Sequence, residues 1–305
     1  MTTATETAIR PLIGKPITKG NVALFPLFRP GHPDSTHIAS HRDHPLVISE
    51  MPSPSVPFLR AFNPHEVAVV IFAGEVVVGG FQQRVLNRTV IVRPGGSVDL
   101  EVSCVEAGRW RGRGEFGDDR AVAPMNIRHA AARGDQDDVW DNVSEVLFAR
   151  GLGHQTTDYF QIRAALTSEP DSMRDEFDPE LARLRSVIDE VAALGPLNGQ
   201  TGYAATIGNK VVQAEIFGQS KYLSAAWEDL SESIFLSRGV VLNPTRRASV
   251  ADRVLEFLGA FDRLTPESPV AGDATGSYFV ASNRRAVARL VLDDNTLVHG
   301  FISAA

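Results

Sequence analysis

The sequence has a single cysteine, Cys104, among 305 residues. One cysteine excludes an intramolecular disulfide and a zinc site built from several cysteines of the same chain. Lysine is also scarce, since it occurs only at positions 15, 19, 210 and 221. The formal net charge is -7, so the chain has no overall basic field of the kind that attracts polyanions. We therefore expect neither nucleic acid nor a membrane surface as a partner.

Long hydrophobic segments and the familiar catalytic motifs are missing as well. No apolar run reaches the roughly 18 residues that a membrane-spanning helix needs, and the start of the chain lacks the apolar stretch of a secretory signal. The patterns GxxxxGK[ST], GxGxxG, GxSxG and HExxH do not occur in a fitting context. These absences predict a cytoplasmic protein without a standard nucleotide-binding, hydrolase or metalloprotease motif.

What is present is an ordinary globular composition, with 43% hydrophobic and 22% charged residues, enough to bury a full core. Residues 1 to about 13 are rich in Thr and Ala and are expected to form a disordered tail. The apolar segment 21–28 reads as a strand, and Pro26 within it favours a sheet edge. Residues 29–62 are rich in proline and histidine, which predicts a long covering loop around one short strand at 46–49.

Regular elements are expected after residue 65. Strands are predicted within 66–80, 87–94 and 97–106, and alternation in the last of these places Cys104 on the apolar face with Val98, Leu100 and Val102. The other predicted elements are helices at 135–151, 178–196, 220–237 and 249–263, a hairpin around Gly208-Asn209, and three strands after 276. The pattern indicates a single α+β domain over 14–305, with mixed or antiparallel sheets built from both halves and about four or five helices.

The densest polar residues lie in and after the first strand block. Strand geometry would bring Glu75, Arg84, Glu106 and Arg109 to one sheet end. Two arginines there could hold a polyanion while two carboxyls contact sugar hydroxyls, bind a metal or transfer a proton. A buried ion-pair network that fixes strand ends explains the same residues equally well.

Cysteine, histidine and tryptophan side chains are further candidates for a functional role. Cys104 as a nucleophile would need a nearby base, and its place on an apolar face favours a core cysteine. A metal site is an alternative for the histidines of the proline-rich segment, although a solvated loop is favoured. Trp110 and Trp140 could stack on a ligand ring or fill the core. The histidines concerned are His32, His37, His41 and His44.

Three segments of this polar region form an ordered pattern: "GEVVVGGFQQRVLNRTVIV" from Gly74, "VSCVEAGRW" ending at Trp110, and "DQDDVW" ending at Trp140. Together they resemble the ARPP-1 family, named for its association with ADP-ribosylglycohydrolase and rhodanese-phosphatase proteins. The sequence departs from the family pattern at Val76, where the family has a second glutamate, and at Gln83, where it has asparagine. The positions that match are Gly74, Glu75, Gln82, Arg84, Leu86, Asn87, Ser103, Cys104, Glu106, Gly108, Arg109, Trp110, Gln136 and Trp140.

The resemblance implies a link to ADP-ribose and NAD chemistry through the family's context. Together with the polar residues, it suggests a nucleotide-like small molecule as ligand, with Glu75 and Glu106 as catalytic acid and base. The ligand-binding residues would be Gln82, Gln83, Arg84, Asn87, Arg109, Trp110, Gln136 and Trp140. No cofactor is indicated. The alternative hypothesis is a non-catalytic accessory protein in which the same residues maintain the fold and another protein is the partner.

Overall fold

The computed structural model describes residues 10–30, 37–108, 116–149, 158–167, 179–243 and 251–305. A nine-stranded sheet, a six-stranded sheet and a four-stranded sheet are formed within these ranges. Nearly all of the pairs are antiparallel, and β4 with β7 is parallel. The fold class is α+β, as the sequence predicts.

The nine-stranded sheet takes strands from both ends of the chain. Its strand order is β1-β3-β13-β14-β19-β18-β17-β15, with β2 pairing to β3 beside β1. Its strands are β1 Leu12–Ile13, β2 Ile17–Lys19, β3 Val22–Phe28, β13 Gln200–Ile207, β14 Lys210–Phe217, β15 Thr265–Glu267, β17 Ser277–Ser282, β18 Ala286–Asp293 and β19 Thr296–Ala304.

The two smaller sheets are formed mainly by residues 38–122. The six-stranded sheet has the order β12-β8-β9-β11-β6-β5, and the four-stranded sheet has the order β16-β10-β7-β4. Their strands are β4 Ile38–Ser40, β5 Val47–Ser55, β6 Phe58–Phe62, β7 Ala68–Ile71, β8 Glu75–Gly79, β9 Arg84–Leu86, β10 Val90–Val92, β11 Ser97–Cys104, β12 Phe116–Val122 and β16 Ala274–Thr275.

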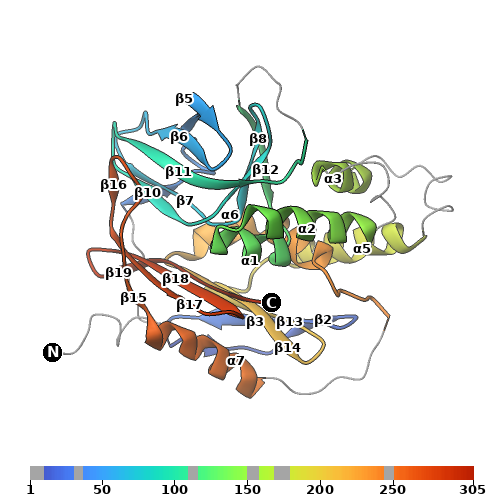
Figure 1. Cartoon of the computed structure of the whole chain (residues 1–305). Coiled ribbons are helices and arrows are strands. Elements are labelled where there is room, and N and C mark those ends of the chain that lie inside the picture. The colour runs from blue at the N-terminus through green and yellow to red at the C-terminus, as the bar shows by residue number, and fades with distance from the viewer. Residues whose placement is uncertain (1–9, 31–36, 109–115, 150–157, 168–178, 244–250) are drawn as a thin grey trace.

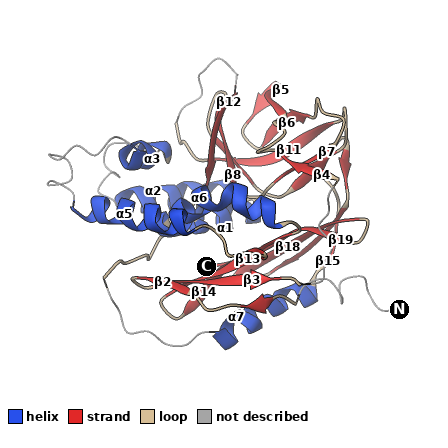
Figure 2. Ribbon diagram, turned by 180° about the vertical axis from the view of Figure 1, so that it is seen from behind, coloured by secondary structure: helices blue, strands red, loops and turns tan. Residues whose placement is uncertain are grey.

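Helices lie between the nine-stranded sheet and the smaller sheets, while α7 covers the far face of the nine-stranded sheet (Figures 1 and 2). The largest apolar cluster joins the central helices to strands on both sides, and a second cluster packs α7 on its sheet. The helices are α1 Met125–Arg133, α2 Gln136–Phe148, α3 Phe160–Thr167, α5 Pro179–Leu194, α6 Ser220–Leu236 and α7 Ala251–Leu258, followed by a 3-10 turn at Gly259–Arg263.

Several predicted elements are confirmed in the structure. The predicted helices correspond to α2, α5, α6 and α7, and the hairpin around Gly208-Asn209 is β13 with β14. The turn between β18 and β19 has positive φ at Asp294 and Asn295, which is the conformation that a two-residue hairpin turn requires. Cys104 is fully buried on β11, in line with its predicted apolar face.

The prediction for residues 29–62 was wrong, because this segment contains three strands and not a loop around one. Strand β5 runs from Val47 to Ser55 and tolerates Pro52 and Pro54, since β5 is the edge of the six-stranded sheet and, within the described residues, pairs with β6 alone. The paired register is also interrupted between Glu50 and Ser55.

The predicted edge position of the strand containing Pro26 was also wrong. Strand β3 pairs with β13 on one side and with β1 and β2 on the other. Pro26 lies in the gap between the short strands β1 and β2, where it needs no amide donor, and its carbonyl accepts the Gly14 amide at 2.8 Å. The pairing of β1 with β3 also places Leu12 and Ile13 in a sheet, although the sequence predicts that they belong to a disordered tail.

The predicted strand 66–80 is divided into β7 and β8, which belong to different sheets. The chain turns between them at Gly74, whose φ of 84° is a conformation that glycine adopts without strain. The strands of residues 66–105 belong to the two smaller sheets, whereas the hairpin of residues 200–217 belongs to the nine-stranded sheet. Within the described ranges, no helix is long and apolar enough to cross a membrane.

Candidate functional site

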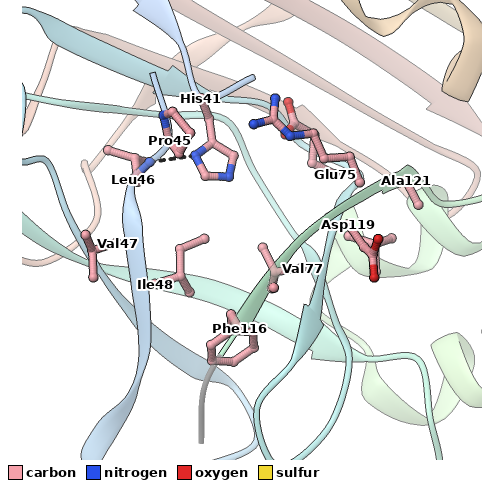
Figure 3. A pocket seen from close by; sticks show the side chains of 13 residues that line it. His41, Pro45, Leu46, Val47, Ile48, Glu75, Val77, Phe116, Asp119 and Ala121 are labelled. Atoms are coloured by element: carbon pink, nitrogen blue, oxygen red, sulfur yellow. Dashed lines mark hydrogen bonds between the residues drawn. The ribbon is translucent and has the colours of Figure 1, made fainter. Parts of the chain in front are cut away.

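A pocket of about 280 Å³ lies between β8, β12 and the segment that leads into β5. Figure 3 shows Ile48, Val77 and Phe116 at one end of it and His41 and Glu75 at the other. The register of β8 and β12 sets this arrangement, because Val122 is the partner of Glu75 across the two strands. The pocket therefore combines an apolar wall with buried titratable groups, as ligand sites commonly do.

Glu75 is the first residue of β8 and is 6% exposed. Burial raises the pKa of its carboxyl above the ordinary value, and this effect outweighs the opposing influence of Arg42 and of the Phe72 amide. Its Oε1 accepts the Phe72 amide at 3.4 Å and lies 3.9 Å from Arg42 Nε. A raised pKa lets a buried carboxyl hold its proton to a higher pH than an exposed one does, which suits it to proton transfer.

His41 faces Glu75 across the pocket (Figure 3). Burial, with the nearby charges of Arg120 and Arg42, lowers the pKa of His41 to about 4, so its ring is neutral at pH 7. Nδ1 accepts the Leu46 amide at 2.9 Å, and the ring proton is therefore on Nε2. Neutral His41 offers a hydrogen-bond donor to a ligand without adding charge.

Arg120 and Asp119, two neighbouring residues of β12, also line the pocket. Arg120 influences the titration of both His41 and Glu75, so its charge lies close to both groups. Among the described residues, the Arg120 guanidinium has no hydrogen-bond or ion-pair partner. Asp119 is exposed. The wall thus presents an unpaired cation and a second carboxylate.

An ion-pair network supports the pocket from behind. Arg42 Nη1 donates to Asp229 Oδ2 of α6 at 2.6 Å, and Arg163 Nε of α3 donates to Glu232 Oε1 of α6 at 2.7 Å. Arg163 Nη1 also donates to the Arg120 carbonyl at 2.8 Å. The network therefore ties β12 and the loop after β4 to the central helices and fixes the backbone that carries Arg120.

The other predicted carboxyl, Glu106, does not line the pocket of Glu75. Arg84 and Cys104 are directly paired across β9 and β11, and Arg84 Nε donates to the Val56 carbonyl at 3.1 Å. Cys104 Sγ lies 3.0 Å from the Glu106 carbonyl, to which Gln82 also donates. Arg84, Cys104, Gln82 and Glu106 thus form a separate buried cluster, which we call the Cys104 cluster.

Burial raises the pKa of the Cys104 thiol, and no histidine is among the groups that influence it. Among the described residues, the groups that influence the thiol therefore do not include the histidine that usually forms the thiolate of a nucleophilic cysteine. The Trp140 indole lies close to this thiol. Arg109 and Trp110 lie outside the described residues.

The histidines weighed as metal ligands do not converge in the part of the chain that the structure describes. His37 Nε2 pairs with Asp293 Oδ2 at 2.6 Å, and His44 packs edge-on against His65. No group of three or more potential ligand side chains occurs within the described ranges. His32 lies outside them.

A family model for the ARG and Rhodanese-Phosphatase-superfamily-associated Protein domain, ARPP-1, matches residues 11–302. The chain belongs to the ARPP-1 family. Comparisons with curated proteins and with solved structures give no significant match. The resemblance seen in residues 74–140 is thus confirmed and extends over nearly the whole ARPP-1 chain.

Several residues that match the ARPP-1 pattern have structural partners. Gln136 accepts the Cys104 amide at 2.8 Å and donates to the Cys104 carbonyl at 2.9 Å, which joins the start of α2 to the end of β11. Asn87 Oδ1 accepts the Ser103 hydroxyl at 2.9 Å. These contacts connect neighbouring strands and helices.

Gly74 has a comparable structural role in the ARPP-1 fold. A Cβ atom at this position would lie 2.1 Å from Arg128 Nε of α1. Arg128 is 2% exposed, and its guanidinium binds Glu215 on β14 and the Ala73 carbonyl. Glycine is therefore required where the turn before Glu75 crosses this buried arginine.

Sequence reasoning identified Glu75 but did not connect it to His41, Arg120 or Asp119. His41 was considered only as a metal ligand, and the segment 116–122 has no clear strand periodicity. The available signal was the run of three charged residues in "DDR" just before an apolar segment. The pairing of β12 with β8 brings Asp119 and Arg120 to Glu75, and His41 reaches the pocket on the segment that follows β4.

Proposed function

We propose that the pocket beside Glu75 binds an ADP-ribose-like or other NAD-derived ligand in the cytoplasm. The observation that carries this proposal is the combination, in one cavity, of a carboxyl with a raised pKa, a neutral histidine and an unpaired guanidinium. Such a ligand has three features: phosphate, ribose hydroxyls and an apolar ring face. The pocket offers a cation for the phosphate, hydrogen-bonding groups for the hydroxyls and an apolar wall for the ring. The context in the name of the ARPP-1 family supports the same ligand class.

Each part of the ligand has a proposed partner. Arg120 binds phosphate through its guanidinium fork. Glu75 and His41 Nε2 donate hydrogen bonds to ribose oxygens, and the apolar wall with Phe116 packs against the ring. If the ligand is processed, Glu75 is the group that gives a proton to the leaving oxygen, because burial raises the pKa of its carboxyl.

A purely structural role is the second candidate function. It is favoured by the contacts of Gln136, Asn87 and Gly74, which are family-matching residues with no place on the pocket wall. In that case the polar pattern stabilises an accessory domain, and the relevant partner is another protein.

Thermal unfolding in the presence of ADP-ribose, NAD, AMP and ribose 5-phosphate tests the proposed ligand class. A ligand at about 100 times its dissociation constant should stabilise the protein by about 2.7 kcal/mol and raise the melting temperature. We expect the shift with ADP-ribose to be absent in Arg120→Ala, because the phosphate loses its cation. Arg60→Ala is the matched control, since Arg60 lies on β6 of the same sheet and pairs with Asp99 outside the pocket.

The variants also separate the two candidate functions. Glu75→Gln should keep the fold, since an amide has a similar size and Arg42 keeps its ion pair with Asp229, but should weaken the ADP-ribose shift. Absence of any shift in the wild-type protein, together with strong destabilisation by Glu75→Gln, would instead support the structural role.

A further inference from the structure

A second cavity, of about 460 Å³, lies where α1, the start of α2 and the turn between β13 and β14 meet. The end of β19 closes one side of it, close beneath α1 in Figure 1. It shares no lining residue with the pocket of Glu75. Its volume falls within the range of about 300 to 1,000 Å³ that is usual for small-molecule sites.

Three cations on the wall of this cavity lack a carboxylate partner among the residues that the structure describes. The side chains of Lys210 and Arg284 are exposed and form no hydrogen bond or ion pair within those residues. Arg133, at the end of α1, donates to the Asn283 carbonyl at 2.6 Å, which holds its guanidinium beside the turn that carries Arg284. A fourth cation, Arg238, is neutralised by Glu145. The wall therefore carries three unpaired positive charges.

The remaining walls are apolar and acidic. Ile207 and Val212 supply apolar surface from the β13–β14 hairpin. Asp135 and Asp138 belong to the first turn of α2, where Asp135 caps the helix by accepting the Asp138 amide at 3.1 Å. The positive end of the helix dipole stabilises both carboxylates there, so they do not need the cations as partners. Their free oxygens can accept hydrogen bonds from hydroxyl or amino groups.

We propose that this cavity is a second ligand site that takes a small organic phosphate of mononucleotide size. Lys210, Arg284 and Arg133 bind the phosphate, whose two negative charges match a group of unpaired cations better than a single carboxylate does. The ring of the ligand packs on Ile207 and Val212, and its hydroxyl or amino groups donate to Asp138. Such a site is distinct from the proposed ADP-ribose pocket and does not depend on it.

Isothermal titration calorimetry with AMP, adenosine and inorganic phosphate tests this site. The purification tag is placed at the N-terminus, because Ala304 and Ala305 line the cavity. We expect AMP to bind the wild-type protein, and the double variant Lys210→Ala/Arg284→Ala to bind it at least about tenfold more weakly, since two charge-assisted contacts are lost. Both side chains are exposed, so the variant should fold normally, which its far-UV circular dichroism and melting temperature would check.

Two controls make the result specific. Arg285→Ala removes the neighbouring arginine, which does not line the cavity, and should leave AMP binding unchanged. Arg120→Ala removes the cation of the other pocket, and the titrations are repeated in this background so that AMP bound at that pocket is not mistaken for AMP bound in this cavity.

Three outcomes would overturn the proposal. They are absence of AMP binding to the wild-type protein, AMP binding that the double variant retains at full affinity, and adenosine binding as tightly as AMP. An affinity for inorganic phosphate equal to that for AMP would reject the mononucleotide class. The proposal for the ADP-ribose pocket is tested by a different measurement, the thermal shift with ADP-ribose in the wild-type protein and in Arg120→Ala. Either proposal can therefore fail without the other.

Discussion

At the scale of single residues, Glu215 has the most complete set of partners near the turn that precedes Glu75. Its carboxylate accepts Arg128 Nη1 and Nη2 at 3.0 and 2.6 Å, the Tyr203 hydroxyl at 2.8 Å and His299 Nε2 at 2.9 Å. Burial alone would raise the pKa of Glu215, but the Arg128 charge and the bonds from His299 and Arg128 outweigh burial and lower the pKa to about 2. The ionised form is therefore the one that stabilises the fold.

The depressed pKa of Glu215 predicts a defined pH dependence of stability. The ordinary value is 4.5, so its contribution is complete above about pH 4.5 and is lost as the pH falls towards 2. Glu215→Gln should lower the free energy of unfolding at pH 7 by about 3 to 5 kcal/mol, because Arg128 keeps its charge without a partner. Urea unfolding at pH 7, 4 and 3 should show this difference shrinking with decreasing pH.

Glu145→Gln is the control for this prediction. Glu145 pairs with Arg238 at the surface, where both side chains are about half exposed, and loss of such a pair should cost less than about 1 kcal/mol. A Glu215→Gln difference that stays constant between pH 7 and 3 would contradict the assigned pKa.

At the scale of elements, the junction of α2 with β11 depends on Gln136. This residue is the first of α2, and its side chain forms hydrogen bonds with both the amide and the carbonyl of Cys104 at the end of β11. One side chain therefore satisfies two backbone groups that have reached the end of the strand. Gln136→Ala leaves a buried amide and carbonyl without partners, which should cost about 1 to 3 kcal/mol.

Chemical unfolding at pH 7 measures the cost of Gln136→Ala directly. The control is Asp137→Asn, which changes the neighbouring exposed residue in the same helical turn and should cost less than about 1 kcal/mol through the helix dipole. Equal losses for the two variants would show that the contacts of Gln136 add nothing beyond helix propensity.

At the scale of the whole molecule, the nine-stranded sheet joins the two ends of the chain. Strand β3, near the start, pairs with β13, and β19, near the end, lies between β14 and β18. Strand β16 belongs to the late part of the chain but pairs with β10 of the four-stranded sheet. These cross-connections are the basis for expecting a single cooperative unit over residues 14–305, which stays a prediction.

Core variants in different sheets test this cooperativity. Ile302→Ala in β19 and Leu59→Ala in β6 remove fully buried side chains, and each should cost about 2 to 5 kcal/mol. In either variant, tryptophan fluorescence and far-UV circular dichroism should report one common transition with the same midpoint. Two separated transitions, with Ile302→Ala moving only one of them, would show that the sheets unfold independently.

Local patterns were sufficient to predict much of the fold. The helix over Pro179–Leu194 follows from an apolar stripe that ends at Gly195 and Pro196, and the hairpin turns follow from Gly208-Asn209 and Asp294-Asn295. Alternation placed Cys104 in the core. Each of these signals acts between residues close in sequence, so the amino acids alone carry it.

The sequence by itself determined the fold class and the family, because these depend on local periodicity and on ordered strings of residue types; it also offered Glu75 as a candidate, and a functional role for that residue stays a prediction. Tertiary structure decided that β5 is an edge strand that accommodates its prolines and that Pro26 falls in a gap between two short strands. It also decided that His41 and Arg120, and not Glu106, meet Glu75 in one pocket. Pairing and burial between distant segments set these features, and the pKa values of Glu75 and His41 arise only once water is excluded around them.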